Sequence, residues 1–174
     1  MKKILLLSDS HGYIDDRIFK YAKWSDEVWH AGDIGDLNVI KSLKKLSLVR
    51  AVYGNIDDSK IRSYYPENIY FECERLPVLI THIGGYPGKY SKRVHDLINK
   101  HRPKLFISGH SHILKVVHDK KYHFLHMNPG AMGLSGFNRK RTMIKFEVND
   151  KKIENVFVID LGNRSRISEN DLKT

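Results

Sequence analysis

The chain has 174 residues, 41% of them hydrophobic, and a formal net charge of +10 at pH 7. This size and hydrophobic content fit one ordinary domain with a real core, so we expect a single domain over 1–162 and a polar tail over 163–174. The lone Cys73 cannot form an internal disulfide, and the aliphatic run after Lys2 and Lys3 is too short for a signal peptide. A cytoplasmic protein is therefore expected.

The positive charge raises the question of an anionic partner such as a nucleic acid. The lysines are scattered over expected helix faces, as at Lys41, Lys44 and Lys45, which favours a solvated basic surface over a nucleic-acid groove. No apolar stretch approaches the roughly 20 residues that a membrane-spanning helix needs. We expect no membrane partner, and the sequence defines no oligomeric state.

The first two-thirds of the chain alternate between strand and helix patterns. Short aliphatic runs predict buried strands, and apolar residues at helical spacing lie between most of them. The expected strands are 3–8, 27–31, 48–53, 78–81 and 104–108, and the expected helices lie near 14–22, 37–46 and 91–101.

The last third of the chain reads as antiparallel strands without helices. The expected strands are 114–118, 122–127, 142–148 and 153–161, with turns at 119–121 and 149–150. No linker separates this part from the alternating part. The sequence therefore predicts an α/β fold in which two sheets share one core, with helices outside.

Polar side chains follow every one of the first five expected strands. Ligands of open α/β sheets gather at the carboxyl ends of the strands, so these side chains are expected at one rim. Seven of them can bind a metal: Asp9, His11, Asp33, Asn55, His82, His110 and His112. All seven are candidate catalytic and metal-ligating residues.

Each of these residues has an ordinary structural explanation when it is taken alone. A single aspartate after a strand commonly caps the next helix, and a single histidine is commonly a hydrogen-bonded core or surface residue. Five loops that obey one rule are hard to explain as caps. If extended geometry continues past the strand ends, Asp9 with His11 and His110 with His112 aim into one cleft, whereas an immediate turn would separate them.

The mixture of ligand types limits which metal ions are expected to bind. Carboxylate, imidazole and amide ligands favour manganese, iron, nickel or zinc over calcium and magnesium, and the lack of thiolates argues against structural zinc. Seven ligands exceed the capacity of one ion. We therefore expect two divalent transition-metal ions, manganese first and nickel, iron or zinc as alternatives, with Asp33 as the candidate bridging carboxylate.

The ordered blocks Asp-x-His, Gly-Asp, Gly-Asn, His and Gly-His-x-His resemble those of the calcineurin-like metallophosphoesterase superfamily, in particular its small single-domain phosphodiesterase branch. The resemblance covers roughly 2–161, and "NPGA" at 128–131 resembles a late turn of that branch. It implies a four-layer α/β/β/α sandwich with two mixed sheets.

The resemblance also implies roles for the seven residues. Asp9, His11 and His112 would hold one ion, Asn55, His82 and His110 would hold the other, and Asp33 would bridge them. A hydroxide bridging the ions would attack phosphorus in line, without a covalent enzyme intermediate.

Three positions depart from the family pattern. Many members carry a histidine directly after Gly-Asn, where this chain has Ile56, so the group that protonates the leaving group is unassigned. The loop at 81–90 lacks the usual compact His-Gly-His pattern. The late turn has Ala131 where serine is common.

Several other residues receive interpretations from their positions. Asp57 is expected either to orient a ligand or to be a turn residue. Asp36 is expected to cap a helix, and His30 and His126 are expected to pack or to support ligands. The run 139–141, Arg-Lys-Arg, is read first as a solvated charge run and otherwise as a grip on a substrate phosphate.

The function predicted from these features is hydrolysis of a small phosphodiester, such as a cyclic nucleotide or an aryl diester, by a two-metal enzyme. A phosphomonoesterase and a nuclease are alternatives within the same superfamily. A protein-interaction scaffold is the alternative of another class, because a retromer coat subunit shares this fold with a degraded metal site. The seven intact ligand positions argue against a pure scaffold.

Overall fold

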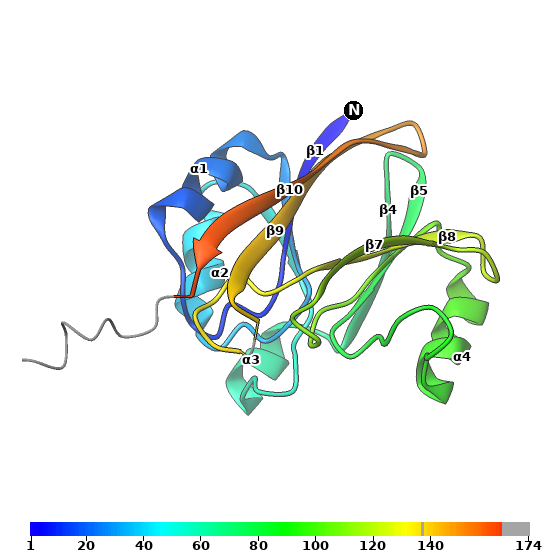
Figure 1. Ribbon diagram of the computed structural model, residues 1–174, viewed down its shortest axis with the longest axis horizontal. Helices are drawn as coiled ribbons and strands as arrows, with labels where there is room; N and C mark the ends of the chain where they lie inside the picture. The colour runs from blue at the N-terminus through cyan, green and yellow to red at the C-terminus, as the bar shows by residue number, and fades with distance from the viewer. Residues whose placement is uncertain (137, 165–174) are drawn as a thin grey trace, which may run out of the picture.

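Two five-stranded mixed sheets pack face to face in the computed structural model, which describes residues 1–136 and 138–164 (Figure 1). The first sheet has the strand order β10-β9-β1-β2-β3, with β1, β2 and β3 parallel and β9 antiparallel to both β1 and β10. Its strands are β1 (Lys2–Leu7), β2 (Glu27–His30), β3 (Leu48–Ala51), β9 (Lys140–Asn149) and β10 (Lys152–Asn163).

The second sheet has the strand order β4-β5-β6-β8-β7. The three central strands run parallel, and each edge strand is antiparallel to its neighbour. Its strands are β4 (Asn68–Cys73), β5 (Leu76–Thr81), β6 (Leu105–Ile107), β7 (Leu114–Asp119) and β8 (Phe124–Pro129). Both sheets therefore place parallel strands next to each other where the polar loops emerge.

Four helices connect the strands, and each begins at a polar capping residue. They are α1 (Asp16–Trp24), α2 (Leu37–Lys44), α3 (Ser59–Tyr64) and α4 (Lys92–His101). The Asp36 side chain accepts a hydrogen bond from the Asn38 amide at the start of α2, at 2.7 Å, which confirms the predicted cap. No helix in the described ranges is both long enough and apolar enough to cross a bilayer.

Three buried clusters show that the layers are helix, sheet, sheet and helix. The central cluster lies between the two sheets and includes Trp29, Phe146 and Ile80. A second cluster joins the first sheet to α1 and α2, and a third joins the second sheet to α4 (Figure 1). The predicted four-layer α/β/β/α sandwich with two mixed sheets is confirmed. Its core is apolar, and most of these side chains are less than 2% exposed.

The sequence predicts no helix or strand over 54–77, whereas the structure places α3 and β4 there. In β4 the side chains of Ile69 and Phe71 pack on the central cluster, whereas Tyr70 between them is exposed. This alternation is typical of an edge strand. The helix α3 has only six residues, so it carries almost no periodic signal.

The chain end departs from the expected tail at its first two positions. Strand β10 continues to Asn163, and Arg164 donates hydrogen bonds to the Gly133 and Asn138 carbonyls, the first at 3.1 Å. The rest of the predicted polar tail, 165–174, lies outside the described residues. The single-domain boundary at 162 stays a prediction.

Candidate metal centre

The seven predicted ligands come from the carboxyl ends of five strands that meet at one rim. Asp9 and His11 follow β1, Asp33 follows β2, Asn55 follows β3, His82 follows β5, and His110 and His112 follow β6. Backbone hydrogen bonds from Asp9 to Gly32 and from His11 to Asp33 join the loops after β1 and β2, at 3.0 and 3.1 Å. The rim is therefore held by main-chain contacts before any ligand is considered.

Five of the seven residues have backbone conformations that non-glycine residues rarely adopt. The φ angles of Asp9, His11, Asp33, His110 and His112 lie between 48° and 67°. The turn thus begins soon after β1 and after β6, so the condition of continued extended geometry is not met, and the expectation that a turn there would keep the paired side chains from one rim was wrong. The left-handed turn still brings both members of each pair to the rim, at a local strain cost of about 1 kcal/mol or more per residue.

The first group of candidate ligands contains Asp9, His11 and His112, one ligand atom from each lying within 4.8 Å of the others. The His112 Nε2 atom is 3.0 Å from Asp9 Oδ1. The His11 and His112 rings meet edge to face, with centroids 5.4 Å apart. Asp9 is fully buried, and both histidines are partly exposed at the rim.

The second group contains Asp33, His82 and His110, again with ligand atoms within 4.8 Å of one another. Asn55 joins this group, because its Oδ1 atom is 3.2 Å from His82 Nε2. The His82 and His110 rings have centroids 5.3 Å apart. The structure therefore collects all seven residues into two neighbouring groups, and the assignment of ions to them stays a prediction.

Asp33 lies between the two groups and presents one carboxylate oxygen to each. Its Oδ1 atom is 3.2 Å from His82 Nε2, and its Oδ2 atom is 3.8 Å from His11 Nε2. The Asp9 carboxylate differs, because its Oδ2 atom accepts hydrogen bonds from the Ser8 hydroxyl at 2.5 Å and the His110 amide at 3.2 Å. Asp9 approaches histidines of both groups with a single oxygen, Oδ1, at 3.0 Å from His112 Nε2 and 4.0 Å from His82 Nε2. Of the two aspartates, only Asp33 directs a different oxygen to each group, as a bridging carboxylate would.

Unpaired lone pairs test whether these residues suit a cation. Among the described residues, Asp9 Oδ1 and His11 Nε2 are buried polar atoms without a hydrogen-bond partner, because the approach of His112 Nε2 to Asp9 Oδ1 at 3.0 Å does not form a hydrogen bond. The His82 Nδ1 atom is 2.7 Å from the Ala31 carbonyl, so it carries the proton and leaves the Nε2 lone pair facing the Asp33 carboxylate. Acceptors that face acceptors in a buried site need a proton or a metal ion between them. The donor set fits a divalent transition metal.

The electrostatics of the ion-free site point the same way. Burial lowers the pKa of His82, but the hydrogen bond to Asp33 and the charge of Asp9 outweigh burial and raise this pKa overall. Burial raises the pKa of Asp33, but the contacts with His82 lower it overall. Burial and the His82 charge both lower the pKa of His110. The carboxylates therefore favour positive charge at the second group.

Two glycines leave no room for a side chain beside the carboxylates. A Cβ atom on Gly54 would lie 2.0 Å from Asp33 Oδ1. A Cβ atom on Gly109 would lie 2.1 Å from the Ser8 hydroxyl and 3.0 Å from Asp9 Oδ2. The Gly-Asn and Gly-His blocks of the sequence are thus required by close approach of the loops to the aspartates.

Asp57 supports the bridging position through three main-chain hydrogen bonds. It accepts from the amides of Ile34 and Gly35, at 3.1 and 2.7 Å, and from Gly54, at 2.8 Å. Ile34 and Gly35 follow Asp33 directly, so Asp57 ties the Asp33 loop to the loop that carries Asn55. Of the two interpretations of Asp57, the structure favours the supporting role.

His30 and His126 are buried supports of the ligand loops. His30 Nε2 lies 2.8 Å from the Ser10 hydroxyl, and Ser10 in turn donates to the Ile34 carbonyl at 2.8 Å. His126 Nε2 lies 3.0 Å from the Ser108 hydroxyl. Burial lowers the pKa of each histidine to about 4, so both are neutral at pH 7.

Three supporting residues were missed by sequence reasoning. Asn128 donates to the Gly109 carbonyl at 2.8 Å and to the Ser111 hydroxyl at 3.1 Å, which fixes the loop of His110 and His112. Asn138 donates to the His112 carbonyl at 2.5 Å, and Arg164 holds the Asn138 carbonyl. The "NPGA" turn pointed to Asn128, whereas nothing in the local sequence marks Asn138 or Arg164.

Neither expectation for the run 139–141 holds at Arg141. This residue is 2% exposed, its Nε atom donates to the Met132 carbonyl at 2.7 Å, and a terminal nitrogen donates to Asp15 at 3.0 Å. Its guanidinium also lies 4.8 Å from the centre of the Tyr13 ring. Arg141 is therefore a buried structural residue, because the interior of the sheet requires its charge to be paired with Asp15.

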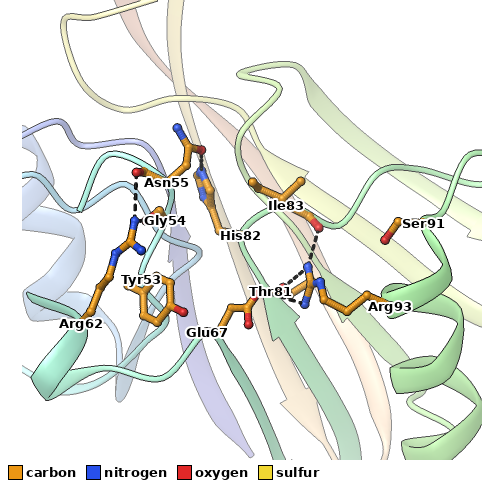
Figure 2. Close-up of a pocket in the computed structure, with 10 residues that line it drawn as sticks. All are labelled: Tyr53, Gly54, Asn55, Arg62, Glu67, Thr81, His82, Ile83, Ser91 and Arg93. Carbon is orange, nitrogen blue, oxygen red and sulfur yellow. Dashed lines mark hydrogen bonds and ion pairs between the residues drawn. The ribbon is translucent and has the colours of Figure 1, made fainter. Parts of the chain in front are cut away.

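A cavity of about 330 Å³ opens beside the second group. Asn55 and His82 form part of its wall. The remaining wall comes from the loop after β3, from α3, from the segment before β4, from the end of β5 and its loop, and from the start of α4. In Figure 2, Tyr53 and Arg62 lie on one side of the opening and Ile83 and Arg93 on the other, with His82 between them. The cavity is thus continuous with the candidate metal centre.

The four-layer fold and the two Asp/His groups together are typical of metal-dependent phosphoesterases. The chain belongs to the calcineurin-like phosphoesterase superfamily, whose domain model matches residues 1–151. The family that the sequence motifs resembled is thereby confirmed. The chain matches no curated protein in a sequence comparison.

Solved structures of small single-domain proteins share the fold. A Thermotoga maritima protein is 23% identical with a TM-score of 0.71, covering 92% of this chain and 100% of its own. A conserved Streptococcus pneumoniae TIGR4 protein, described as a predicted phosphoesterase, is 21% identical with a TM-score of 0.68, covering 96% of this chain and 94% of its own. Vps29 of Entamoeba histolytica, solved with Zn²⁺, is 15% identical with a TM-score of 0.70, covering 91% of this chain and 98% of its own. These likenesses concern the fold alone.

Proposed function

We propose that the chain is a two-metal phosphodiesterase that hydrolyses small phosphodiesters. The observation that carries this proposal is the Asp33 carboxylate, which directs one oxygen to His82 and the other to His11. Two ions, when bound, supply an activated water at neutral pH and stabilise charge on the phosphoryl oxygens. The chain's own contribution is to hold the two ligand groups at a fixed separation and to leave Asp9 Oδ1 and His11 Nε2 without hydrogen-bond partners.

The rim supports a diester over a monoester. Each of three ligand loops places an apolar side chain directly after a candidate ligand, and Ile56, Ile83 and Ile113 are 46%, 47% and 54% exposed. A monoester dianion would gain most from further cations next to the ligands, whereas apolar neighbours suit the organic arms of a diester. Ile56 also donates its amide to Asp33 Oδ1 at 3.1 Å, so this position supports the bridging carboxylate through its main chain.

The metals and the compartment are part of the proposal. Manganese is proposed first, with nickel, iron and zinc as alternatives, because imidazole and carboxylate ligands without thiolates suit all four. The Zn²⁺ complex of Entamoeba histolytica Vps29 supports a divalent metal on this fold. A cytoplasmic location is proposed from the single Cys73, which is buried and free.

The test is metal-dependent hydrolysis by chelated protein. We expect Mn²⁺ to restore turnover of bis(p-nitrophenyl) phosphate, with a higher kcat/KM than for p-nitrophenyl phosphate, and we expect Asp33→Asn to abolish it. His118→Gln is the matched control, because His118 is exposed on β7. A preference for the monoester would favour a phosphomonoesterase. Turnover of polynucleotides with a steep salt dependence would favour a nuclease, and no turnover with any divalent ion would favour a scaffold.

A further inference from the structure

The cavity beside the second ligand group has a position that suits the organic arm of a substrate. Asn55 and His82 belong both to the candidate metal centre and to the wall of the cavity. A phosphate held by the two ligand groups would therefore direct one ester arm into this space. The volume of about 330 Å³ lies at the small end of ligand pockets, which span roughly 300–1,000 Å³. The cavity is large enough for one compact arm.

The wall on the first-sheet side is an aromatic ring in a fixed orientation. The Arg62 guanidinium lies 4.9 Å from the centre of the Tyr53 ring, and Arg62 also donates to the Asp57 carbonyl at 2.7 Å and to the Asn55 carbonyl at 3.1 Å. The Tyr53 amide donates to the Pro66 carbonyl at 3.0 Å. Arg62 covers one face of this half-buried ring, so a planar group would stack on the part of the ring that lines the cavity (Figure 2).

The wall on the second-sheet side carries polar groups of both signs. Arg93 donates to the Ile83 carbonyl at 2.9 Å and to the Asn68 side chain at 2.6 Å, and its guanidinium is 3.4 Å from the Glu67 carboxylate. Ile83 adds an exposed apolar surface beside these groups. Because Glu67 is paired with Arg93, this wall offers both hydrogen-bond donors and acceptors, which match the polar edge of a neutral heterocycle.

We propose that this cavity binds the nucleoside arm of a nucleotide diester, with the base against Tyr53 and Ile83 and its polar edge towards Glu67 and Arg93. This inference rests on the proposed function for the placement of the phosphate. It goes further in naming the substrate class as nucleotide diesters and Tyr53 as the residue that selects them. Stacking of one base on an aromatic side chain is worth roughly tenfold to a hundredfold in binding.

The first experiment needs no metal and no turnover. Thymidine, a neutral nucleoside, is titrated into ¹⁵N-labelled metal-free protein. We expect saturable shifts at the amides of Tyr53, Ile83 and Arg93. These shifts should be lost in Tyr53→Leu and retained in Tyr64→Leu, because Tyr64 is 66% exposed on α3 and does not line the cavity. No shifts at these amides up to the solubility limit of thymidine would overturn the proposal.

The second experiment compares two diesters that differ in one arm. Thymidine 5′-(p-nitrophenyl phosphate) and methyl p-nitrophenyl phosphate carry the same charge and release the same p-nitrophenolate. We expect kcat/KM to be about ten- to a hundredfold higher for the nucleoside ester. Tyr53→Leu should remove most of this ratio while leaving the methyl ester within about threefold. Equal kcat/KM values, or a ratio that survives in Tyr53→Leu, would overturn the nucleoside assignment.

Two further outcomes separate this inference from the proposed function. If neither ester is hydrolysed with any divalent ion, the phosphodiesterase proposal fails. The thymidine titration then decides by itself whether the cavity binds a nucleoside. If Tyr53→Leu does not fold, Glu67→Gln replaces it, because Glu67 has a 49% exposed side chain. Glu67→Gln should lower kcat/KM for the nucleoside ester several-fold and leave the methyl ester unchanged, and an unchanged nucleoside ester would count against the proposal.

Discussion

The Asp33 Oδ1 atom lies 3.2 Å from His82 Nε2, and the other nitrogen of the His82 ring is fixed by the Ala31 carbonyl at 2.7 Å. The histidine is thereby held in the tautomer that presents a lone pair to the carboxylate. A carboxylate and an imidazole lone pair in contact bind a cation between them in preference to remaining ion-free. We therefore expect metal binding to depend on Asp33 more than on any other candidate ligand.

Asp33→Asn should therefore cost more activity than any other single change of a candidate ligand. The charge that faces both groups would be lost, and the affinity for both ions should fall by more than the roughly 10–100-fold typical of losing a group that only orients a ligand. Elemental analysis after dialysis, together with kcat/KM for a diester, measures both effects. If Asp9→Asn and Asp33→Asn lose comparable activity and both still hold two metals, the bridging assignment is wrong.

Asp57→Asn should weaken the centre without touching a ligand. Its carboxylate accepts from three amides, and an amide side chain would place an N–H group against one of them. We expect a loss of about 2–3 kcal/mol in the free energy of unfolding and a 10–100-fold loss of metal affinity. Urea denaturation and metal titration provide the two measurements.

The adjacent Asp58→Asn is the matched control for this change. Asp58 caps α3 by accepting from the Ile61 amide at 2.8 Å, and asparagine caps helices about as well as aspartate. Its stability and metal affinity should stay close to those of the unchanged protein. Equal metal affinity in the Asp57 and Asp58 variants would show that Asp57 does not position the Asp33 loop.

Arg141→Met should destabilise the fold and leave substrate affinity alone. Asp15 would lose the hydrogen bond from Arg141. Burial alone raises the pKa of Asp15, but in the unchanged protein its hydrogen bonds, that from Arg141 first, lower this pKa overall. We expect a loss of about 3 kcal/mol, against less than about 0.5 kcal/mol for the exposed Arg139→Met. Urea midpoints and KM for a diester, measured on both variants, distinguish this from a substrate grip, which would raise KM.

His126 should make the metal-free protein less stable as pH falls below 6.5. The pKa of His126 in the folded state is about 4, against 6.5 in the unfolded chain. Between these pH values His126 binds a proton in the unfolded chain but stays neutral in the folded protein. Each unit of pKa difference is worth about 1.4 kcal/mol, which gives a loss of about 2 kcal/mol at pH 5.

Urea denaturation of metal-free protein at pH 7 and pH 5 measures this effect. The difference between the two pH values should shrink by about 2 kcal/mol in His126→Gln. It should be unchanged in His118→Gln, where the histidine is exposed on β7. A pH dependence that is identical in both variants would contradict a neutral, buried His126.

The sequence by itself determined the layers and the membership of the candidate site. Aliphatic runs such as Leu5–Leu7 can only be buried, and glycines beside Asp33 and Asn55 mark places where the chain must turn closely. Because parallel strands end at a common edge, the position of each polar residue after its strand predicted that the seven would meet. The structure collects them in two groups.

Only the tertiary structure decided how these side chains are aimed and what supports them. Asp9 and His112 reach the same group through left-handed turns. Asn138 supports the main chain of His112 and is held in turn by Arg164, near the end of the described chain. Local patterns report periodicity and residue type, not which distant segments contact each other. Arg141 pairs with Asp15, which lies 126 residues away in the chain. The cavity between Tyr53 and Arg93 forms where the two sheets and α4 meet. Neither feature can be read from a local stretch of sequence, because each depends on the packing of distant segments.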